Sequence, residues 1–206
     1  LADAVRPGCS RAGATPNDKN DLLRRIAELA ASSDALAGTP ADRIEEGLRA
    51  REDLGSTGFG GGIAIPHCRL PELSEFTVGV VAVPGGVEFD ALDGEPVRAL
   101  VYIVAPDSRS SDHIRILSEI SQALSHPGIV DELCAQTDPA ALTESFLRHA
   151  SPQIEDDAGS GHQLIQILVQ DEERFRALLE LFGGIRPAFF TILEAENPGA
   201  YLRRLP

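Results

Sequence analysis

The sequence predicts an α/β fold, because helical and strand-like segments follow one another along the chain. Two apolar stretches of strand length, at residues 77–83 and 99–105, lie in its middle part. Segments with apolar residues at helical spacing lie before and after them. Since a helix and a strand each bury one apolar face, elements in this order are expected to form layers around a shared core.

The first segment, residues 1–15, is expected to be an irregular lead-in with at most one weak strand. A helix follows over about residues 19–31, because Asn17 or Asp18 can cap its first turn. Its apolar residues share one face at helical spacing: Leu22, Leu23, Ile26 and Leu29.

A second helix is expected to open at Thr39-Pro40. Thr39 would be its N-cap and Pro40 its first residue. Proline is tolerated at this position because the N–H of the first helical residue has no partner within the helix. Ile44, Leu48 and Arg51 follow at helical spacing. Arg51 is therefore predicted near the end of this helix.

A glycine-rich segment, residues 55–62, comes next and leads into a short apolar run that ends at His67. The two strands named above follow it. Between them, residues 87–97 are expected to form a hairpin-like element, with Asp93-Gly94 as its turn.

Three helices are expected after the strands. Residues 110–112 would cap the first, over about 113–125. The residues predicted on its buried face are Ile114, Leu117, Ile120 (or Ser121) and Leu124. A short helix from Pro127 or Gly128 to Cys134 follows, and the last runs from Asp138-Pro139 to about residue 150.

The chain is expected to divide into a domain over residues 1–150, a linker at 151–161 and an extension at 162–206. The linker is polar, acidic and contains glycine, serine and proline. The extension has a strand–helix–strand pattern that is too small to close a core alone. It is expected to dock on the main domain, to pair with another copy, or to be part of something larger.

The charge excludes two classes of partner. The 206 residues carry 18 basic and 32 acidic side chains, a net charge of −14, and Lys19 is the only lysine. Non-specific binding to nucleic acid or to an anionic membrane needs a positive surface, so neither is expected.

The sequence also indicates a cytoplasmic protein. No apolar run approaches the roughly 18 residues of a membrane span, and the charged first 30 residues do not resemble a secretory signal. Cys9, Cys68 and Cys134 are widely spaced, which favours free thiols over disulfides or a metal site. The chain begins at a leucine and contains no methionine, which is typical of a shortened chain or a piece of a longer protein.

His67 is the first candidate for chemistry. The glycine-rich segment before it can bring backbone amides close to an anion, and Pro66 fixes the turn that would present the imidazole at a loop rim. A neutral imidazole beside such donors suits phosphoryl transfer to a ring nitrogen. The plainer alternative is a turn histidine whose ring is merely hydrogen-bonded.

Two further residues would complete such a site. His113 lies at the start of a predicted helix, where free N–H groups favour a phosphate. The guanidinium of Arg51 can hold two phosphate oxygens at once. Each has a plainer alternative, a surface histidine and a surface ion pair.

Three segments resemble one family. Residues 51–67, REDLGSTGFGGGIAIPH, resemble the active-site signature of the fructose/mannitol-type enzyme IIA domain of the bacterial phosphoenolpyruvate-dependent sugar phosphotransferase system, which includes a nitrogen-regulatory branch. FDALDGEPV at residues 89–97 and the stretch from Ala105 to Ser118 resemble two later elements of that family in the same order. The likeness covers about residues 15–150.

The resemblance implies a mixed sheet flanked by helices, as in enzyme IIA mannitol, with the site at one rim. It implies that His67 is phosphorylated, that His113 supports it and that Arg51 stabilises the phosphoryl oxygens. Phosphate donors are expected at Ser56, Thr57, Gly58, Gly60 and Gly62. It implies no metal or organic cofactor, an HPr-like carrier as phosphoryl donor and a IIB domain as acceptor.

Departures from the family pattern leave alternatives open. Cys68 stands where the family usually has glycine or another small residue, which would place a thiol beside the site. Residues 162–206 resemble the opening of a PII-like or ferredoxin-like domain, and an appendage packed on the main sheet is the alternative. The chain could therefore be a phosphocarrier, or a regulatory module of a membrane transporter whose extension senses a ligand or forms oligomers. A domain with an inactive site is the third alternative.

Overall fold

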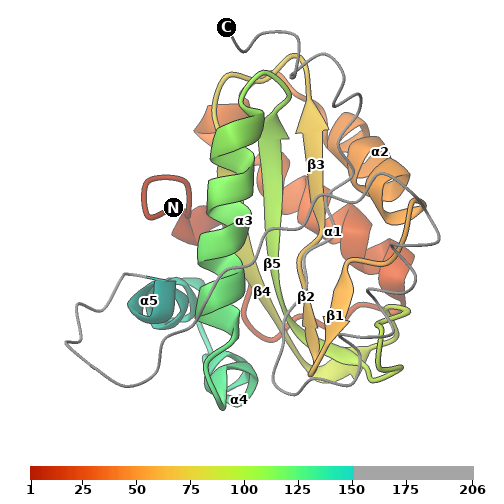
Figure 1. Cartoon of the computed structure of the whole chain (residues 1–206), viewed down its shortest axis with the longest axis vertical. Coiled ribbons are helices and arrows are strands. Elements are labelled where there is room, and N and C mark those ends of the chain that lie inside the picture. The colour runs from red at the N-terminus through yellow and green to blue at the C-terminus, as the bar shows by residue number, and fades with distance from the viewer. Residues whose placement is uncertain (151–206) are drawn as a thin grey trace, which may run out of the picture. The chain divides into compact units, whose positions relative to one another are not determined.

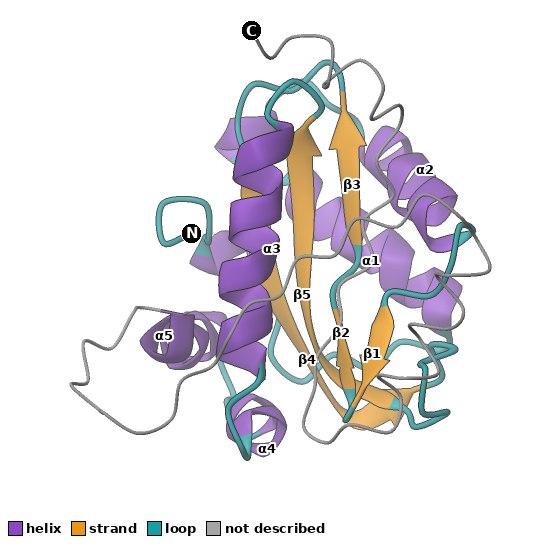
Figure 2. Ribbon diagram, viewed as in Figure 1, coloured by secondary structure: helices purple, strands orange, loops and turns teal. Residues whose placement is uncertain are grey.

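The computed structural model describes residues 1–150, so the expectations for 151–161 and 162–206 lie outside the described residues. A five-stranded mixed sheet forms the centre of the described part (Figures 1 and 2). Its strands are β1 (Gly58–Gly60), β2 (Ile63–Ala64), β3 (His67–Leu70), β4 (Thr77–Val87) and β5 (Val97–Pro106). Both β2 and β3 lie parallel to β5, β4 pairs antiparallel with β5, and β1 pairs antiparallel with β2. The predicted mixed sheet is confirmed.

Pro66 separates β2 from β3 along the same side of β5. Proline has no N–H for the ladder, but its carbonyl still accepts the N–H of Ile103 at 3.0 Å. β5 therefore pairs first with β2 and then with β3. Because β1 pairs with β2 and no described strand lies beyond β3, the far side of β3 is an open edge of the sheet.

Helices cover both faces of the sheet. In Figure 1, α1 (Lys19–Ala31) and α2 (Ala41–Glu52) lie behind it, and α3 (Ser110–Leu124), α4 (Ile129–Cys134) and α5 (Pro139–Ala150) lie in front. Two apolar clusters result, because alternate residues of a strand face opposite sides. The α1–α2 side buries Leu22, Ile26, Ile44, Leu48, Cys68, Leu70 and Tyr102. The α3–α5 side buries Ile65, Val80, Ile103, Ile116, Leu117, Ile120 and Phe146.

The N-terminal segment covers the outer edge of β4. A short 3-10 helix (Pro7–Cys9) and two isolated bridges to β4 are its regular features, as the sequence predicted. Arg11 donates its N–H to Val80 O and accepts from Ala82 N, both at 2.9 Å. Asp18 then caps α1 by accepting the N–H of Asp21 at 2.8 Å, which confirms that predicted start.

Two predicted helix starts were wrong. α2 begins at Ala41 after Pro40, whose side chain can accept no capping hydrogen bond, so Thr39 is not the N-cap. α3 begins at Ser110, before the predicted residue 113. Its buried face includes His113, which is 5% exposed, whereas Ile114 is 42% exposed. The face that packs Leu117 and Ile120 on the sheet passes through position 113, so the polar histidine takes the inward place.

The remaining elements follow their predictions closely. β4 and β5 are longer than expected and pair up to Val87 and Val97, so residues 87–97 form the connection between them. Gly94 N donates to Ala91 O in the predicted turn. α5 is capped by Asp138, which accepts the N–H groups of Ala140 and Ala141 at 3.0 Å.

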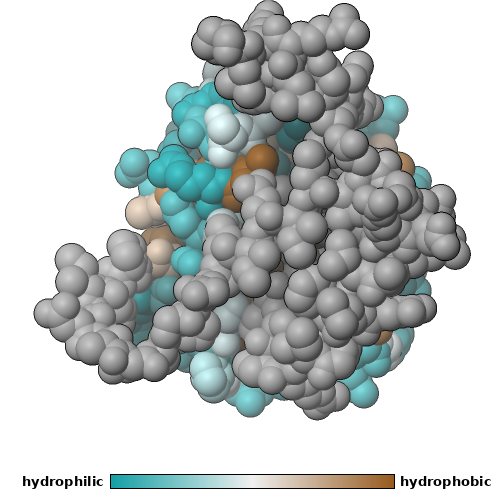
Figure 3. Space-filling model, viewed as in Figure 1, coloured by the Kyte–Doolittle hydropathy of each residue, from teal (hydrophilic) through white to brown (hydrophobic). Residues whose placement is uncertain are grey.

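The described part shows no feature of a membrane span. Within residues 1–150, no helix combines the length and apolar content needed to cross a bilayer. The side chains of residues 1–150 that can be seen in Figure 3 are mostly hydrophilic. Cys9, Cys68 and Cys134 are free thiols, as predicted.

Candidate functional site

His67 is the first residue of β3 and lies at the open edge of the sheet. It is 7% exposed, so the predicted position on a loop rim was wrong. Pairing of β3 with β5, with His67 opposite Ile103, draws the residue after Pro66 into the sheet. Cys68 joins the apolar cluster beneath α1 and α2, so the alternation of the strand turns His67 toward the α3 side.

Two hydrogen bonds hold the imidazole of His67. Nδ1 lies 2.8 Å from Ile65 O, and the Nε–H of Arg51 donates to Nε2 at 3.1 Å. Because a carbonyl oxygen only accepts, Nδ1 carries the ring proton and Nε2 carries the lone pair. Burial lowers the pKa of His67 to about 4, so the ring is neutral near pH 7.

Arg51 reaches this nitrogen from the other helical layer. It lies in the last turn of α2, and its Nη1 donates to Gly55 O at 3.0 Å. The guanidinium is thus held by the loop that follows its own helix. Its positive charge stands beside the lone pair of His67, where the oxygens of a transferred group would gather.

His113 is the second histidine of the site. It lies in the first turn of α3, and its ring centroid is 5.4 Å from that of His67. Burial lowers its pKa to about 4, and the neighbouring His67, Arg69 and Arg51 act in the same direction. Among the described residues, its Nδ1 has no hydrogen-bond partner. A buried polar atom without a partner is costly, so this nitrogen is available to a ligand group.

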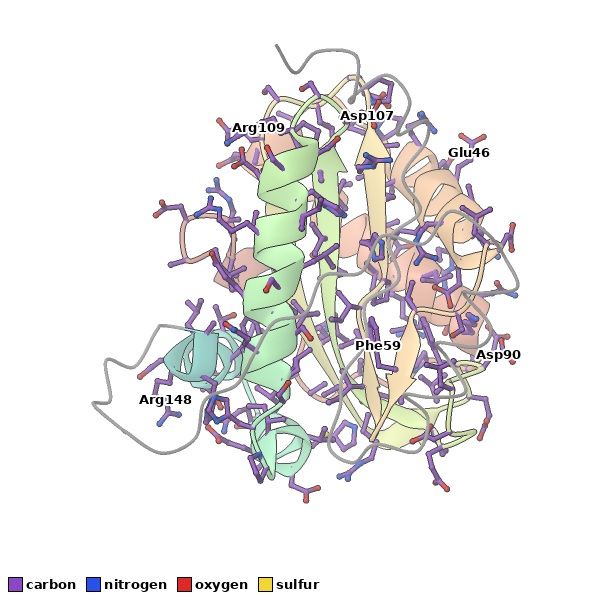
Figure 4. All side chains as sticks on the ribbon, in the orientation of Figure 1. Glu46, Phe59, Asp90, Asp107, Arg109 and Arg148 are labelled. Atoms are coloured by element: carbon purple, nitrogen blue, oxygen red, sulfur yellow. The ribbon has the colours of Figure 1, made fainter. Side chains whose placement is uncertain are left out.

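Arg69 is a further cation of the site that the sequence reasoning missed. It follows His67 by two positions in β3, and residues at this spacing in a strand share a face. Its Nη1 donates to Ser110 Oγ at 3.1 Å, and its Nε lies 3.7 Å from Asp107. Asp107 is labelled in Figure 4 where β5 ends, close to the first turn of α3. The spacing from His67 was the signal that could have found it.

The predicted hydroxyl donors already have partners. Ser56 Oγ donates to Phe89 O at 2.8 Å and accepts the Gly58 N–H at 3.1 Å. Thr57 is 2% exposed, and both its N–H and its hydroxyl donate to the Glu52 carboxylate, at 2.9 and 2.6 Å. The structure therefore brings Arg51, His67 and His113 together, but it ties these two hydroxyls to the protein.

The glycine-rich segment contains β1 and the turn that joins β1 to β2. Gly60 has φ +101° and Gly62 has φ +77°, and a Cβ on Gly60 would lie 2.9 Å from Asp93 Oδ2. Asp93 accepts the Gly61 N–H at 2.7 Å. The side chain of Phe59, labelled in Figure 4, comes from β1, between Gly58 and Gly60.

Glu52 is a second residue that the sequence reasoning missed. It is 7% exposed and forms an ion pair with Lys19, with 2.9 Å between Oε1 and Nζ. Lys19 also contacts Asp90 at 3.0 Å and lies 4.8 Å from the centre of the Phe89 ring. An acidic residue at the end of a helix is usually solvated, so no local signal marks this burial.

Cys68 lies away from the histidine pair. Its side chain belongs to the core beneath α1 and α2, and burial raises the pKa of its thiol to about 12. A side-chain carbon on Gly47 of α2 would lie 3.2 Å from its Cβ. Within residues 1–150, no three His, Cys, Asp or Glu side chains are grouped so that they could hold a metal ion.

Comparison with known proteins identifies the fold and the family. Residues 6–149 match the family model described as phosphoenolpyruvate-dependent sugar phosphotransferase system, EIIA 2. A nitrogen regulatory protein from Pseudomonas aeruginosa is 38% identical over 142 residues, which is 69% of this chain and 91% of that protein.

Two solved structures agree. The nitrogen regulatory protein IIA-Ntr from Neisseria meningitidis has a TM-score of 0.65 and 25% identity, over 70% of this chain and 97% of that one. IIA mannitol from Escherichia coli, at 19% identity, has a TM-score of 0.58 over 68% and 97% of the two chains, and so supports the fold. Because the matched residues span most of the chain and contain the whole Arg51–His67–His113 site, the chain belongs to the EIIA 2 family of the phosphoenolpyruvate-dependent sugar phosphotransferase system.

Proposed function

We propose that this chain is a phosphocarrier whose phosphoryl group is carried on Nε2 of His67. The observation that carries the proposal is the state of that nitrogen. Nδ1 is committed to Ile65 O, and Nε2 holds the lone pair with Arg51 beside it. A buried, neutral imidazole with a fixed tautomer is prepared to act as a nucleophile.

In the proposed step, the lone pair of His67 Nε2 forms a bond to the phosphorus of a phosphohistidine on an HPr-like carrier. The bond from that phosphorus to the donor's ring nitrogen breaks, and its electron pair stays on the donor imidazole. Arg51 leaves Nε2 and donates to the phosphoryl oxygens, while His113 lies across the pocket and orients the group. In the onward step, a nucleophile of a IIB-type acceptor forms a bond to the phosphorus. The bond from phosphorus to Nε2 of His67 breaks, its electron pair returns to the imidazole, and Arg51 and His113 hold the group through the same contacts.

Hydrogen-bond donors beside His67 must offset the repulsion between a phosphoryl group and the negative net charge of the chain. A phosphoryl group adds about two negative charges to a chain whose net charge is already −14. Surface charges farther than about 8 Å are largely screened at physiological salt, whereas Arg51 and Arg69 act at close range. Gly58, Gly60 and Gly62 remain our proposed amide donors, but the Gly58 N–H now donates to Ser56 Oγ and would have to leave it. Ser56 and Thr57 would have to exchange their present partners to contact phosphate, so Arg51 has the leading role.

A regulatory output is the second candidate, and the 38% identity to a nitrogen regulatory protein favours it. In this proposal phosphorylation of His67 is the regulatory signal. A partner such as a membrane transporter would bind the phosphorylated and the unphosphorylated protein with different affinity. Residues 162–206 lie beyond the matched family region, and they would sense a ligand or join copies of the chain. Both candidates place the protein in the cytoplasm and need no cofactor.

The experiment is phosphoryl transfer in a reconstituted relay. The chain is incubated with phosphoenolpyruvate, enzyme I and either HPr or its nitrogen-branch paralogue. We expect one added phosphoryl group, localised by mass spectrometry to His67, and none in a His67→Gln variant. Absence of transfer from several cognate carriers, or a phosphoryl group on another residue, would overturn the proposal.

A further inference from the structure

The Glu52 carboxylate is a buried charged group that the proposed transfer step does not use. Its two oxygens accept the N–H and the hydroxyl of Thr57, and Lys19 Nζ lies 2.9 Å from one of them. Both oxygens of this carboxylate are therefore bound by other residues of the chain and not directed toward a ligand. In some proteins a buried ionic group of this kind fixes one conformation of the groups that it binds.

One side of this arrangement leads to Arg51. The bonds between Glu52 and Thr57 close a tight loop, and Gly55 N also donates to Glu52 O at 3.1 Å within it. Gly55 takes φ +148° there, and its carbonyl accepts Nη1 of Arg51. The position of the guanidinium therefore depends on a loop that the Glu52 carboxylate closes.

The other side leads to His67. Thr57 O accepts the N–H of Ile65 at 3.0 Å, and Ile65 O in turn holds Nδ1 of His67 at 2.8 Å. Thr57, which Glu52 holds, is thus linked to the imidazole of His67 by two successive hydrogen bonds through Ile65. The bond to Ile65 O is the one that leaves the lone pair on Nε2.

The counter-charge comes from the single lysine of the chain. Lys19 is the first residue of α1, and its side chain is 19% exposed. Removing the cation would leave Glu52 as a buried, uncompensated carboxylate, which is strongly unfavourable. The ion pair also connects α1 to the end of α2.

We propose that Glu52, neutralised by Lys19, is a positioning residue. Through Thr57 it fixes the position of the Arg51 guanidinium and of the His67 imidazole. It touches neither the phosphoryl group nor the reacting nitrogen. Its role is to fix the distance and direction between the guanidinium and Nε2, and misplacement by about 1 Å can cost on the order of a hundredfold in rate. The rate measured below rests on the proposed phosphocarrier function, whereas the spectroscopic measurement does not.

The test uses isosteric changes at Thr57. Thr57→Val keeps the volume and removes the hydroxyl donor, whereas Thr57→Ser keeps the donor. Thr143→Val is the matched control, because Thr143 is also buried and its hydroxyl bonds to Ser10 and Pro139, in α5 on the other face of the sheet. Each full-length variant is examined for its rate of phosphoryl acceptance, for the ¹⁵N chemical shifts of the His67 ring without phosphate, and for its free energy of unfolding.

We expect Thr57→Val to lower the rate by about tenfold or more and to shift the His67 ring nitrogens toward a mixture of tautomers. Thr57→Ser should restore both, and Thr143→Val should lose stability without either change. Lys19→Met acts on Glu52 from the other end and should reproduce the effect of Thr57→Val. A folded Thr57→Val protein with the wild-type rate and the wild-type ring shifts would overturn the proposal, as would equal effects of Thr57→Val and Thr143→Val. If the wild type accepts no phosphate, the phosphocarrier proposal fails, and the ring shifts still decide the role of Glu52.

Discussion

Arg51 Nε donates a hydrogen bond to His67 Nε2 over 3.1 Å, so the lone pair that would attack phosphorus is occupied in the phosphate-free protein. The arginine must leave this nitrogen before a bond to phosphorus can form. The same guanidinium then stands beside the phosphoryl oxygens, to which it can donate two hydrogen bonds. The guanidinium of Arg51 therefore binds Nε2 in the phosphate-free protein and would stabilise the phosphoryl group after transfer.

Replacement of Arg51 should impair transfer far more than folding. Arg51→Ala removes hydrogen bonds that would strengthen as negative charge develops on the phosphoryl oxygens in the transition state. We therefore expect the rate of phosphoryl acceptance to fall by roughly a hundredfold. The free energy of unfolding should change by only about 1 kcal/mol, since the variant loses two hydrogen bonds at a partly open edge. The measurements are transfer from phosphorylated HPr and urea denaturation.

Arg49→Ala is the matched control for this change. Arg49 lies in the same helical turn, but it pairs with Glu45 and Asn20. Its removal should leave transfer unchanged. A parallel loss of folding and transfer in Arg51→Ala would show that Arg51 is structural.

The turn between β1 and β2 should tolerate a methyl group at one glycine better than at its neighbour. Gly60→Ala places a Cβ 2.9 Å from the Asp93 carboxylate at φ +101°, and we expect a loss of roughly 2 kcal/mol. Gly61→Ala meets open space at φ +63° and should lose about 1 kcal/mol. Gly85→Ala meets open space without a positive φ and is the control. Equal denaturation midpoints for all three would contradict the strained turn.

Local signals were enough to predict most of the helices and strands in residues 1–150, and they marked Arg51, His67 and His113 as candidates for chemistry. Asp18 was one of two predicted cap residues and Asp138 was the predicted start of the last helix, and both cap through their own neighbours. Arg51, His67 and His113 were predicted as one set because their order matches a family signature. Their meeting at the edge of β3 depends on pairing across the sheet, which no local pattern contains.

The failures share a physical cause. His113 and Glu52 are polar, and a single-sequence pattern assigns polar residues to the solvent face, yet both are buried by long-range partners. Glu52 is paired with Lys19 from another helix, and the ring of His113 faces His67 from β3. The family resemblance implied that Thr57 is a phosphate donor, and in the structure a buried carboxylate already accepts its hydroxyl. In each case the missing information was the tertiary partner.

Arg69 should contribute to the capture of the phosphorylated donor. Its side chain is 43% exposed, it shares a strand face with His67, and it faces solvent beside the site. Arg69→Gln is expected to raise KM for the phosphorylated carrier more than it lowers kcat, and to weaken the dependence of kcat/KM on salt. Arg43→Gln, which removes an arginine paired with Glu72 and Glu46, should change neither. A fall in kcat alone would assign Arg69 to the chemical step.

Acid should destabilise the protein through the buried histidine pair. Burial lowers the pKa of both His67 and His113 to about 4, whereas an unfolded histidine titrates near 6.5. Between these values the unfolded chain binds more protons than the folded one, so the free energy of unfolding falls as the pH falls from about 6.5 toward 4. Above pH 6.5 both states are neutral at these rings and the effect vanishes.

The size of the acid effect can be checked by urea denaturation at pH 7.5 and pH 5. Each histidine should cost on the order of 2 kcal/mol at pH 5, reduced where the two titrations are coupled. A His67→Gln, His113→Gln double variant should show a flatter dependence on pH, although carboxylates such as Glu132 add their own. The ¹⁵N shifts of the wild-type rings should report neutral imidazoles at pH 5.5, and protonation there would show that the pair is not desolvated. Because the nucleophile stays neutral, phosphoryl acceptance should persist at pH 6, where a solvent-exposed histidine would be largely protonated.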